Sequence, residues 1–337
     1  MEDPVAMPSA ENHVQPERLL KDLRKLWSDL AKQDESGVLR ACALTLVVAI
    51  RDTPEAVQQV GETIAMLMHE HPSRAIVIRV QDGDGPTFDA QVLAQCWMPF
   101  GRRQQICCEQ IEITCTHGTL EDLPSVIRGL VVPDLPVVLF CPDADLCRSG
   151  EFAPVVALCD KLIVDSGETS GLAAAKYLNS MNRPGLRRAD LAWGRLTPWR
   201  ETVARLFETP AALRAIPNLE NIQILYAGAD EPIGVYYFAA WFMHVLGAGV
   251  HLNIARGVGP SYGSIAKVKI EGRHFEAEAE LIDAHSVEVK SPEQSQHILF
   301  PDLTHYDLLR QELSIVGRDP VFVDVLGLAT LLDAPKP

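Results

Sequence analysis

Apolar residues recur along the chain with two spacings, and these spacings predict its strands and helices. The continuous apolar runs Cys42–Ile50 and Leu135–Cys141 are typical of strands that are covered on both faces of a sheet. A helix is expected to begin at Thr53-Pro54, between the first of these runs and a further strand at Arg74–Val80. Strand, helix and strand in this order predict a βαβ unit.

Two runs that alternate between apolar and polar residues follow, and they predict an antiparallel hairpin inserted in the α/β domain. If the turn is centred between Gly101 and Arg102, residues equally distant from it face each other, which places Cys96 opposite Cys107. We predict that Cys96 and Cys107 are neighbours and form the redox-sensitive pair of the chain. Cys108 points to the other face and would be the more exposed thiol if that face is solvated.

The pattern changes at Asn182-Arg183-Pro184-Gly185, a cluster of residues that favour turns. Beyond it, strands grouped ahead of two closing helices are typical of an α+β domain. We therefore expect three parts: a tail and leading helix in residues 1–35, an α/β domain with a mixed sheet in residues 36–181, and an α+β domain in residues 186–337.

Composition narrows the classes of function. The 337 residues carry a formal net charge of -15, which argues against nucleic acid or an anionic membrane as a partner. No apolar run reaches the length of a membrane span, and the first residues are acidic without an apolar core. The eight cysteines have scattered spacings, unlike the disulfide framework of a small secreted domain. We expect a cytoplasmic protein.

Motifs for cofactors and metals are incomplete, so we expect neither a cofactor nor a metal site. Two places could still hold an anion. Ser166, in the turn 165–168 between a strand and a helix, is either a helix cap or an anion contact. Gly257 and Gly259, in the glycine-rich loop 257–263, could cradle a phosphate or simply form a tight turn. These places support an alternative prediction, an enzyme that binds a nucleotide or a sugar phosphate.

The most distinctive stretch is Asp190–Phe207, DLAWGRLTPWRETVARLF. Thr197 and Pro198 suit the start of a helix, Thr197 as its cap, and the following apolar residues form a stripe at helical spacing. Tryptophan and arginine are favoured at binding hot spots, so Trp193 and Trp199 could belong to a docking surface. Large aromatic residues also dominate cores, and the open alternative is that both tryptophans anchor the core between the two domains.

The segment DLAWGRLTPWRE closely resembles the signature of the OpcA family, the glucose-6-phosphate dehydrogenase assembly or effector proteins. The segments HPSRAIVI, GLVVPDLPVVLFC and LIVDSGE agree with it in order. The resemblance implies a non-catalytic protein that binds glucose-6-phosphate dehydrogenase and promotes its active oligomer. The expected contact surface is built around Trp193, Arg195, Trp199 and Arg200. In some relatives the resemblance also implies redox control linked to thioredoxin.

Overall fold

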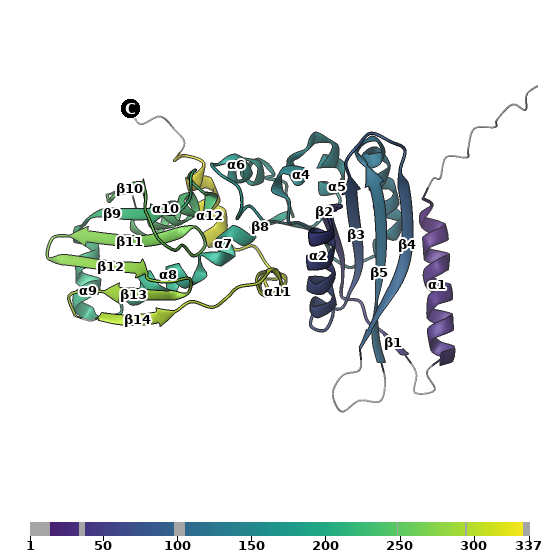
Figure 1. Ribbon diagram of the computed structural model, residues 1–337, viewed down its shortest axis with the longest axis horizontal. Helices are drawn as coiled ribbons and strands as arrows, with labels where there is room; N and C mark the ends of the chain where they lie inside the picture. The colour runs from purple at the N-terminus through teal and green to yellow at the C-terminus, as the bar shows by residue number, and fades with distance from the viewer. Residues whose placement is uncertain (1–13, 34–37, 98–104, 248, 294, 333–337) are drawn as a thin grey trace, which may run out of the picture. The chain divides into compact units, whose positions relative to one another are not determined.

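The computed structural model describes residues 14–33, 38–97, 105–247, 249–293 and 295–332. The chain divides into two compact units, of which the first takes Met1–Leu139 and Ser149–Cys159 and the second takes Phe140–Arg148 and Asp160–Pro337. The division falls within strand β6 (Val137–Cys141). Figure 1 shows both units with most of their helices and strands labelled.

The first unit is built on a sheet with the strand order β1-β5-β3-β2-β6. Strand β5 pairs in parallel with β1 and β3, and β3 pairs in parallel with β2. Strand β4 pairs antiparallel with β5. The bounds are β1 (Val38–Arg40), β2 (Leu44–Arg51), β3 (Ser73–Gln81), β4 (Phe88–Trp97) and β5 (Gln105–Thr116).

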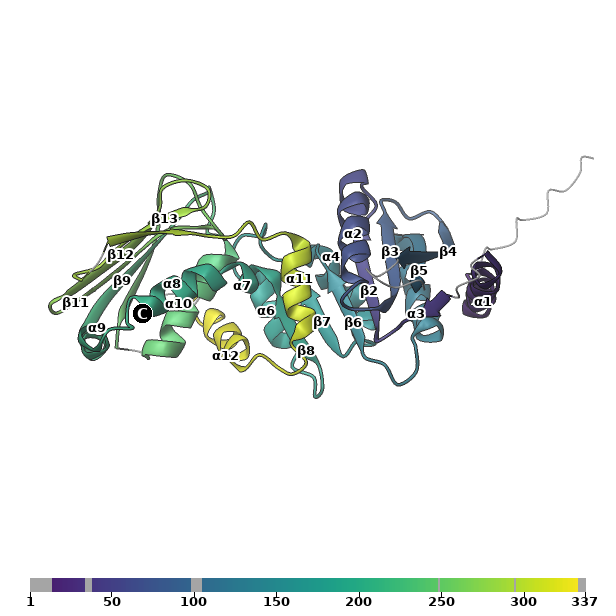
Figure 2. The same cartoon turned by 90° about the horizontal axis from the view of Figure 1, so that it is seen from below.

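Helices cover both faces of these parallel strands, which is why β2 is apolar almost throughout. Figure 2 shows α2 (Pro54–Leu67) on one face and α3 (Leu123–Leu130) on the other. As predicted, Thr53 caps α2, because its side chain accepts a hydrogen bond from the backbone N–H of Ala56. Helix α1 (Pro16–Gln33) contacts β4 and α3, and Trp27 Nε1 donates to Glu109 Oε1 at 2.7 Å.

The predicted hairpin is part of this main sheet, since β5 has strand neighbours on both of its edges. Its turn lies outside the described residues. Three shorter elements of the unit complete it: η1 (His117–Asp122), η2 (Gly150–Phe152) and α5 (Ala153–Val156). The βαβ unit expected from the sequence is therefore confirmed in β2, α2 and β3.

The second unit begins with α4 (Ala144–Arg148) and the parallel pair β7 (Lys161–Val164) and β8 (Arg187–Asp190). Helix α6 (Ala173–Ser180) lies between these two strands in the chain. Three helices follow β8 in close succession: α7 (Leu191–Arg195), α8 (Thr197–Arg205) and α9 (Pro210–Ala215), the last continued by η3 (Ile216–Asn218).

A six-stranded sheet with the order β10-β9-β11-β12-β13-β14 forms the rest of this unit. Strand β10 is parallel to β9, and the remaining pairs are antiparallel. In Figure 2, helices α8, α9 and α10 lie on one face of this sheet. The bounds are β9 (Leu219–Tyr226), α10 (Ile233–Leu246), β10 (His251–Arg256), β11 (Ile265–Gly272), β12 (Phe275–Leu281), β13 (Ser286–Lys290), β14 (Ser295–Leu299), α11 (His305–Ser314) and α12 (Pro320–Ala329).

Strand β12 shows how the sequence directs this one-sided packing. Phe275, Ala277 and Ala279 are buried, and the glutamates between them point to the opposite face. The predicted class, an α/β region followed by a second mixed sheet with helices, is confirmed. No helix among the described residues is both long enough and apolar enough to span a bilayer.

Candidate functional site

The distinctive stretch 190–207 folds into two short helices joined at Leu196. Asp190 caps the first of them, α7, because its carboxylate accepts the backbone N–H of Ala192 at 3.0 Å. The second, α8, begins at Thr197 itself, with Leu196 in the capping position. The prediction that Thr197 caps this helix is wrong, because α7 runs directly into α8 and leaves no extended residue there.

Both tryptophans of the stretch lie in the core of the second unit, 3% and 0% exposed for Trp193 and Trp199. The Trp193 ring packs against Phe322, with ring centroids 5.9 Å apart, and its Nε1 donates to Asp319 Oδ2. Trp199 Nε1 donates to the carbonyl of Tyr262 at 2.9 Å. The structure thus places both indoles in the interior of the second unit itself, and neither ring is presented to solvent.

Arg200 lies across the face of Trp193, with its guanidinium carbon 3.4 Å from the ring centroid. Its Nη2 donates to Thr197 Oγ1 at 2.7 Å, while its buried Nε has no hydrogen-bond partner among the described residues. Burial lowers the pKa of Arg200 to about 10. The Thr197 hydroxyl therefore accepts a hydrogen bond from the Arg200 guanidinium and does not cap the helix.

Arg195 forms a bidentate pair with Asp165, through N···O distances of 2.6 and 2.7 Å. His305 Nε2 lies 2.8 Å from the second oxygen of the same carboxylate. Burial opposes ionisation of Asp165, but the hydrogen bonds from His305 and Arg195 outweigh it and hold the pKa of Asp165 below its usual range. Three segments distant in sequence thus meet at the carboxyl end of β7.

A second buried carboxylate, Asp190, lies at the carboxyl end of β8 and is 0% exposed. Besides the N–H of Ala192, it accepts the backbone N–H and the hydroxyl of Ser166 and the hydroxyl of Tyr237 at 2.8 Å. Burial raises the pKa of Asp190 to about 6, because the charged form loses its hydration. Ser166 was expected as a helix cap or an anion contact, and its hydroxyl instead donates to Asp190.

The glycine-rich loop 257–263 is packed against other parts of the second unit. The N–H of Gly257 donates to the carbonyl of Tyr226 at 2.7 Å. Gly263 has a positive φ, and a side chain there would meet the backbone oxygen of Arg195 at 3.3 Å. Gly259 also has a positive φ, with open space around it. These contacts are those of a tight turn, the second of the two expectations for this loop.

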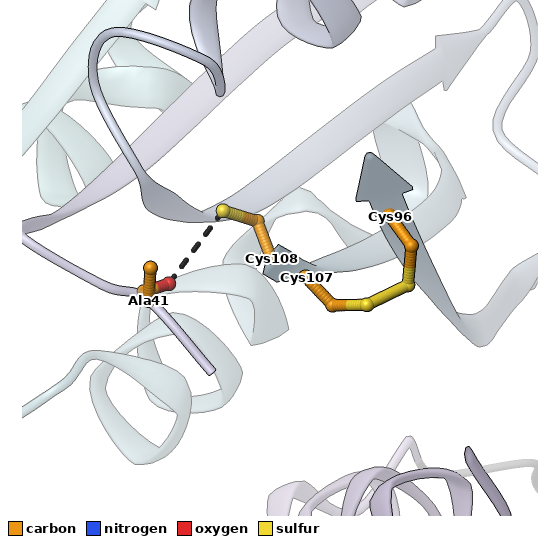
Figure 3. The surroundings of a disulfide bond; sticks show 4 residues. All are labelled: Ala41, Cys96, Cys107 and Cys108. Carbon is orange, nitrogen blue, oxygen red and sulfur yellow. Dashed lines mark hydrogen bonds between the residues drawn. A yellow bond between two sulfur atoms is a disulfide. The ribbon is translucent and has the colours of Figure 1, made fainter. Parts of the chain in front are cut away.

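The cysteine pair of the first unit has the predicted register. In the β4–β5 ladder Cys96 lies opposite Cys107, the two Cα atoms are 4.1 Å apart, and a disulfide joins the side chains (Figure 3). Cys96 is exposed and Cys107 is buried. A hollow of about 170 Å³ adjoins Cys96 and includes Met66, His69 and Trp97 in its lining.

Cys108 points away from this disulfide toward Ala41, as Figure 3 shows, with its sulfur 3.5 Å from the Ala41 carbonyl oxygen. It is buried, so this face is not solvated and the condition for an exposed thiol at Cys108 is not met. The chain around β1 covers this face, and burial raises the pKa of the Cys108 thiol to about 11. A three-residue strand such as β1 leaves too weak a sequence pattern for this cover to be foreseen.

Two functional candidates were not predicted from the sequence. Asp190 could have been recognised from the sequence, because Asp is a preferred helix cap and Asp190 comes directly before the residues of α7. His305 had none, since it reaches Asp165 across 140 residues of sequence. Within the part of the chain that the structure describes, no three His, Cys, Asp or Glu side chains gather as a metal site.

Comparison with protein families divides the chain into two matched regions. Residues 47–182 match the model described as the glucose-6-phosphate dehydrogenase subunit N-terminal domain. Residues 187–326 match the model described as the C-terminal domain of the same subunit. This chain belongs to the OpcA family.

Two cyanobacterial OpcA proteins named for the OxPP cycle are among its relatives. The OpcA protein of Synechocystis sp. is 30% identical over 53% of this chain and 37% of its own length. That of Nostoc punctiforme is 27% identical over 54% of this chain and 39% of its own length. The matched part is therefore well under two thirds of either relative.

Among solved structures, the transcriptional regulator Gal80p of Kluyveromyces lactis aligns with a TM-score of 0.49 and 12% identity. The alignment covers 96% of each chain. A likeness of this size says nothing about the function of this OpcA family member.

Proposed function

We propose that this chain binds glucose-6-phosphate dehydrogenase, promotes its active oligomer and catalyses no reaction of its own. The observation that carries the proposal is the pair of family matches, which follow one another along the chain and are both described as domains of a subunit of that enzyme. A binding protein of this kind needs a stable framework and an accessible surface, and no reacting groups.

The contacts of the stretch 190–207 support a framework role for its residues. Trp193 and Trp199 are packed in the core, and the arginines beside them, Arg195 and Arg200, are held by Asp165 and by the Trp193 ring. Ser166 and Asp190 satisfy each other. We infer that these residues keep the second unit in the shape that its partner recognises.

The test is co-purification of the chain with the dehydrogenase of the same host, followed by activity and sizing with and without the chain. We expect a complex, a shift of the dehydrogenase to a larger oligomer, and a higher rate. The chain alone, with glucose 6-phosphate and a nicotinamide cofactor, should reduce no cofactor. Turnover by the purified chain would overturn the non-catalytic proposal, and failure to form a complex would overturn the binding proposal.

The Cys96–Cys107 disulfide supports redox control of this binding. Cys96 is exposed, so a dithiol reductant such as thioredoxin could reach its sulfur. Reduction would take two electrons and two protons from the reductant and leave two thiols on the hairpin. We expect the oxidised and reduced chains to differ in their activation of the dehydrogenase, and equal activation would reject this control.

A further inference from the structure

Strand β14 (Ser295–Leu299) is the last strand of the six-stranded sheet, so one of its edges has no neighbour in the sheet order. The N–H of Phe300 donates to the carbonyl of His285, which fixes the phase of the ladder between β13 and β14. Bonded and non-bonded pairs alternate along antiparallel strands. The N–H and C=O groups of His297 and Leu299 therefore point away from β13, toward the free edge.

This edge lacks the features that usually protect an edge strand. It contains no proline, lysine or other charged residue that would discourage pairing. Leu299 is 78% exposed. In the described part of the chain, the outward backbone groups of His297 and Leu299 have no backbone partner. An edge of this kind readily accepts a further strand.

A hollow of about 240 Å³ lies between β14 and the helix α8. Ile298, Phe300, Pro198 and Thr202 are part of its lining. Residues directly opposite one another on paired strands share a face of the sheet. A residue that paired with Ile298 from an added strand would therefore direct its side chain into this hollow, where an apolar group fits.

Charged residues of α8 border the same hollow and indicate the character of its occupant. Glu201 and Arg205 stand one helical turn apart, both are exposed, and neither forms a salt bridge among the residues that the structure describes. They can pair with a basic and an acidic residue of an incoming segment. A second copy of this chain fits less well, because two chains of net charge -15 repel each other.

We propose that an extended segment of the dehydrogenase adds to β14 as a seventh strand. One apolar side chain of this segment fills the hollow beside α8, and flanking charges meet Glu201 and Arg205. This inference rests on the proposed function, because it identifies the surface on which that binding occurs.

Two substitutions on the edge test the docking site. Leu299→Lys adds a charge at the free edge, and His297→Pro removes an N–H that points toward the incoming strand. Each should weaken binding to the dehydrogenase by about tenfold or more, as expected at a binding hot spot. The matched control is Val258→Lys, since Val258 is also apolar, is 100% exposed, and follows β10, the strand at the other end of the sheet order. It should change affinity by less than about twofold.

Hydrogen exchange gives a second readout that does not depend on substitution. In the wild-type chain, the amides of His297 and Leu299 should exchange quickly alone and more slowly in the complex. Thermal unfolding of each variant should match the wild type, which separates lost docking from lost folding.

The binding measurements distinguish failure of the docking site from failure of the proposed function. If the wild type binds the dehydrogenase and both edge variants bind equally well, the docking site is wrong and the proposed function stands. If the wild type does not bind the dehydrogenase at all, both the docking site and the proposed function are wrong. If the chain alone is a dimer that His297→Pro dissociates, a second copy occupies the edge and the inference is overturned.

Discussion

The guanidinium of Arg200 lies 3.4 Å from the ring centroid of Trp193, so a half-buried arginine stacks on a buried indole. Arg200 forms no salt bridge with any residue that the structure describes, and the stack explains how its charge is accommodated beside the core. Because the planar group is shared between a ring face and Thr197, its shape matters as much as its charge.

Arg200→Lys should therefore destabilise the protein although it preserves the charge. The ammonium group cannot both cover the ring and reach Thr197, and we expect a loss of about 1 kcal/mol in the free energy of unfolding. Denaturant titration followed by circular dichroism measures this. The exposed Arg214 on α9 offers a control, since Arg214→Lys should leave the midpoint unchanged; equal effects at both positions would contradict the role of the stack.

Trp199→Ala should reduce stability much more, by about 3–5 kcal/mol, because a fully buried ring would leave a cavity. Any loss of dehydrogenase activation in this variant should then follow the loss of folded protein. Thermal unfolding and activation are measured on the same sample. A Trp199→Ala protein that melts like the wild type but no longer activates would instead assign the residue a direct contact.

Asp190 should make the wild type less stable as pH rises from about 4 to about 6. Its pKa is raised from 3.8 to about 6 in the folded state, so the folded protein binds more protons than the unfolded chain in this window. The stabilising contribution is present below pH 4 and is lost above pH 6, a change of about 3 kcal/mol.

Asp190→Asn isolates this effect, because the variant cannot titrate there while the rest of the chain does so as before. The free energy of unfolding of the variant, relative to the wild type, should rise as pH increases from 4 to 6. Denaturant titrations at several pH values measure the difference. A difference that stays constant across the window would show that Asp190 ionises without cost.

Mild reduction followed by alkylation should label the exposed Cys96 before the buried thiols Cys108 and Cys115. Burial raises the pKa of Cys108 to about 11 and that of Cys115 to about 12, so both thiols are protonated and shielded at neutral pH. Mass spectrometry of the labelled peptides gives the order. Without reductant, Cys96 should stay unlabelled, because the disulfide holds its sulfur; early labelling of Cys108 would contradict the packing around β1.

The register of the hairpin could be predicted because the alternation of side chains between the two faces of a strand is a local property of the sequence. Alternation places Cys96 and Cys107 on one face, and the turn length then sets which residues meet. The buried strands were predictable for a similar reason, since their continuous apolar runs leave few alternatives. The domain boundary expected at residues 182–185 stays a prediction; the family matches end and begin on either side of it, at residues 182 and 187.

Other features depended on contacts that no local pattern encodes. A tryptophan beside an arginine looks the same whether it faces a partner or the core, and only the position of Phe322 and Tyr262 decides for Trp193 and Trp199. The meeting of Asp165 with His305 is of the same kind. Free edges such as that of β14 become visible only when the strand order of the whole sheet is known.

The disulfide lies where the sheet of the first unit has least support. Along most of its length β5 is flanked by β4 and by the long strand β3, but near Cys107 its second neighbour is the three-residue β1. The covalent link therefore joins β4 to β5 where the short strand β1 is the second neighbour of β5. Opening that bond would change little in the middle of the sheet and would release its most loosely held corner.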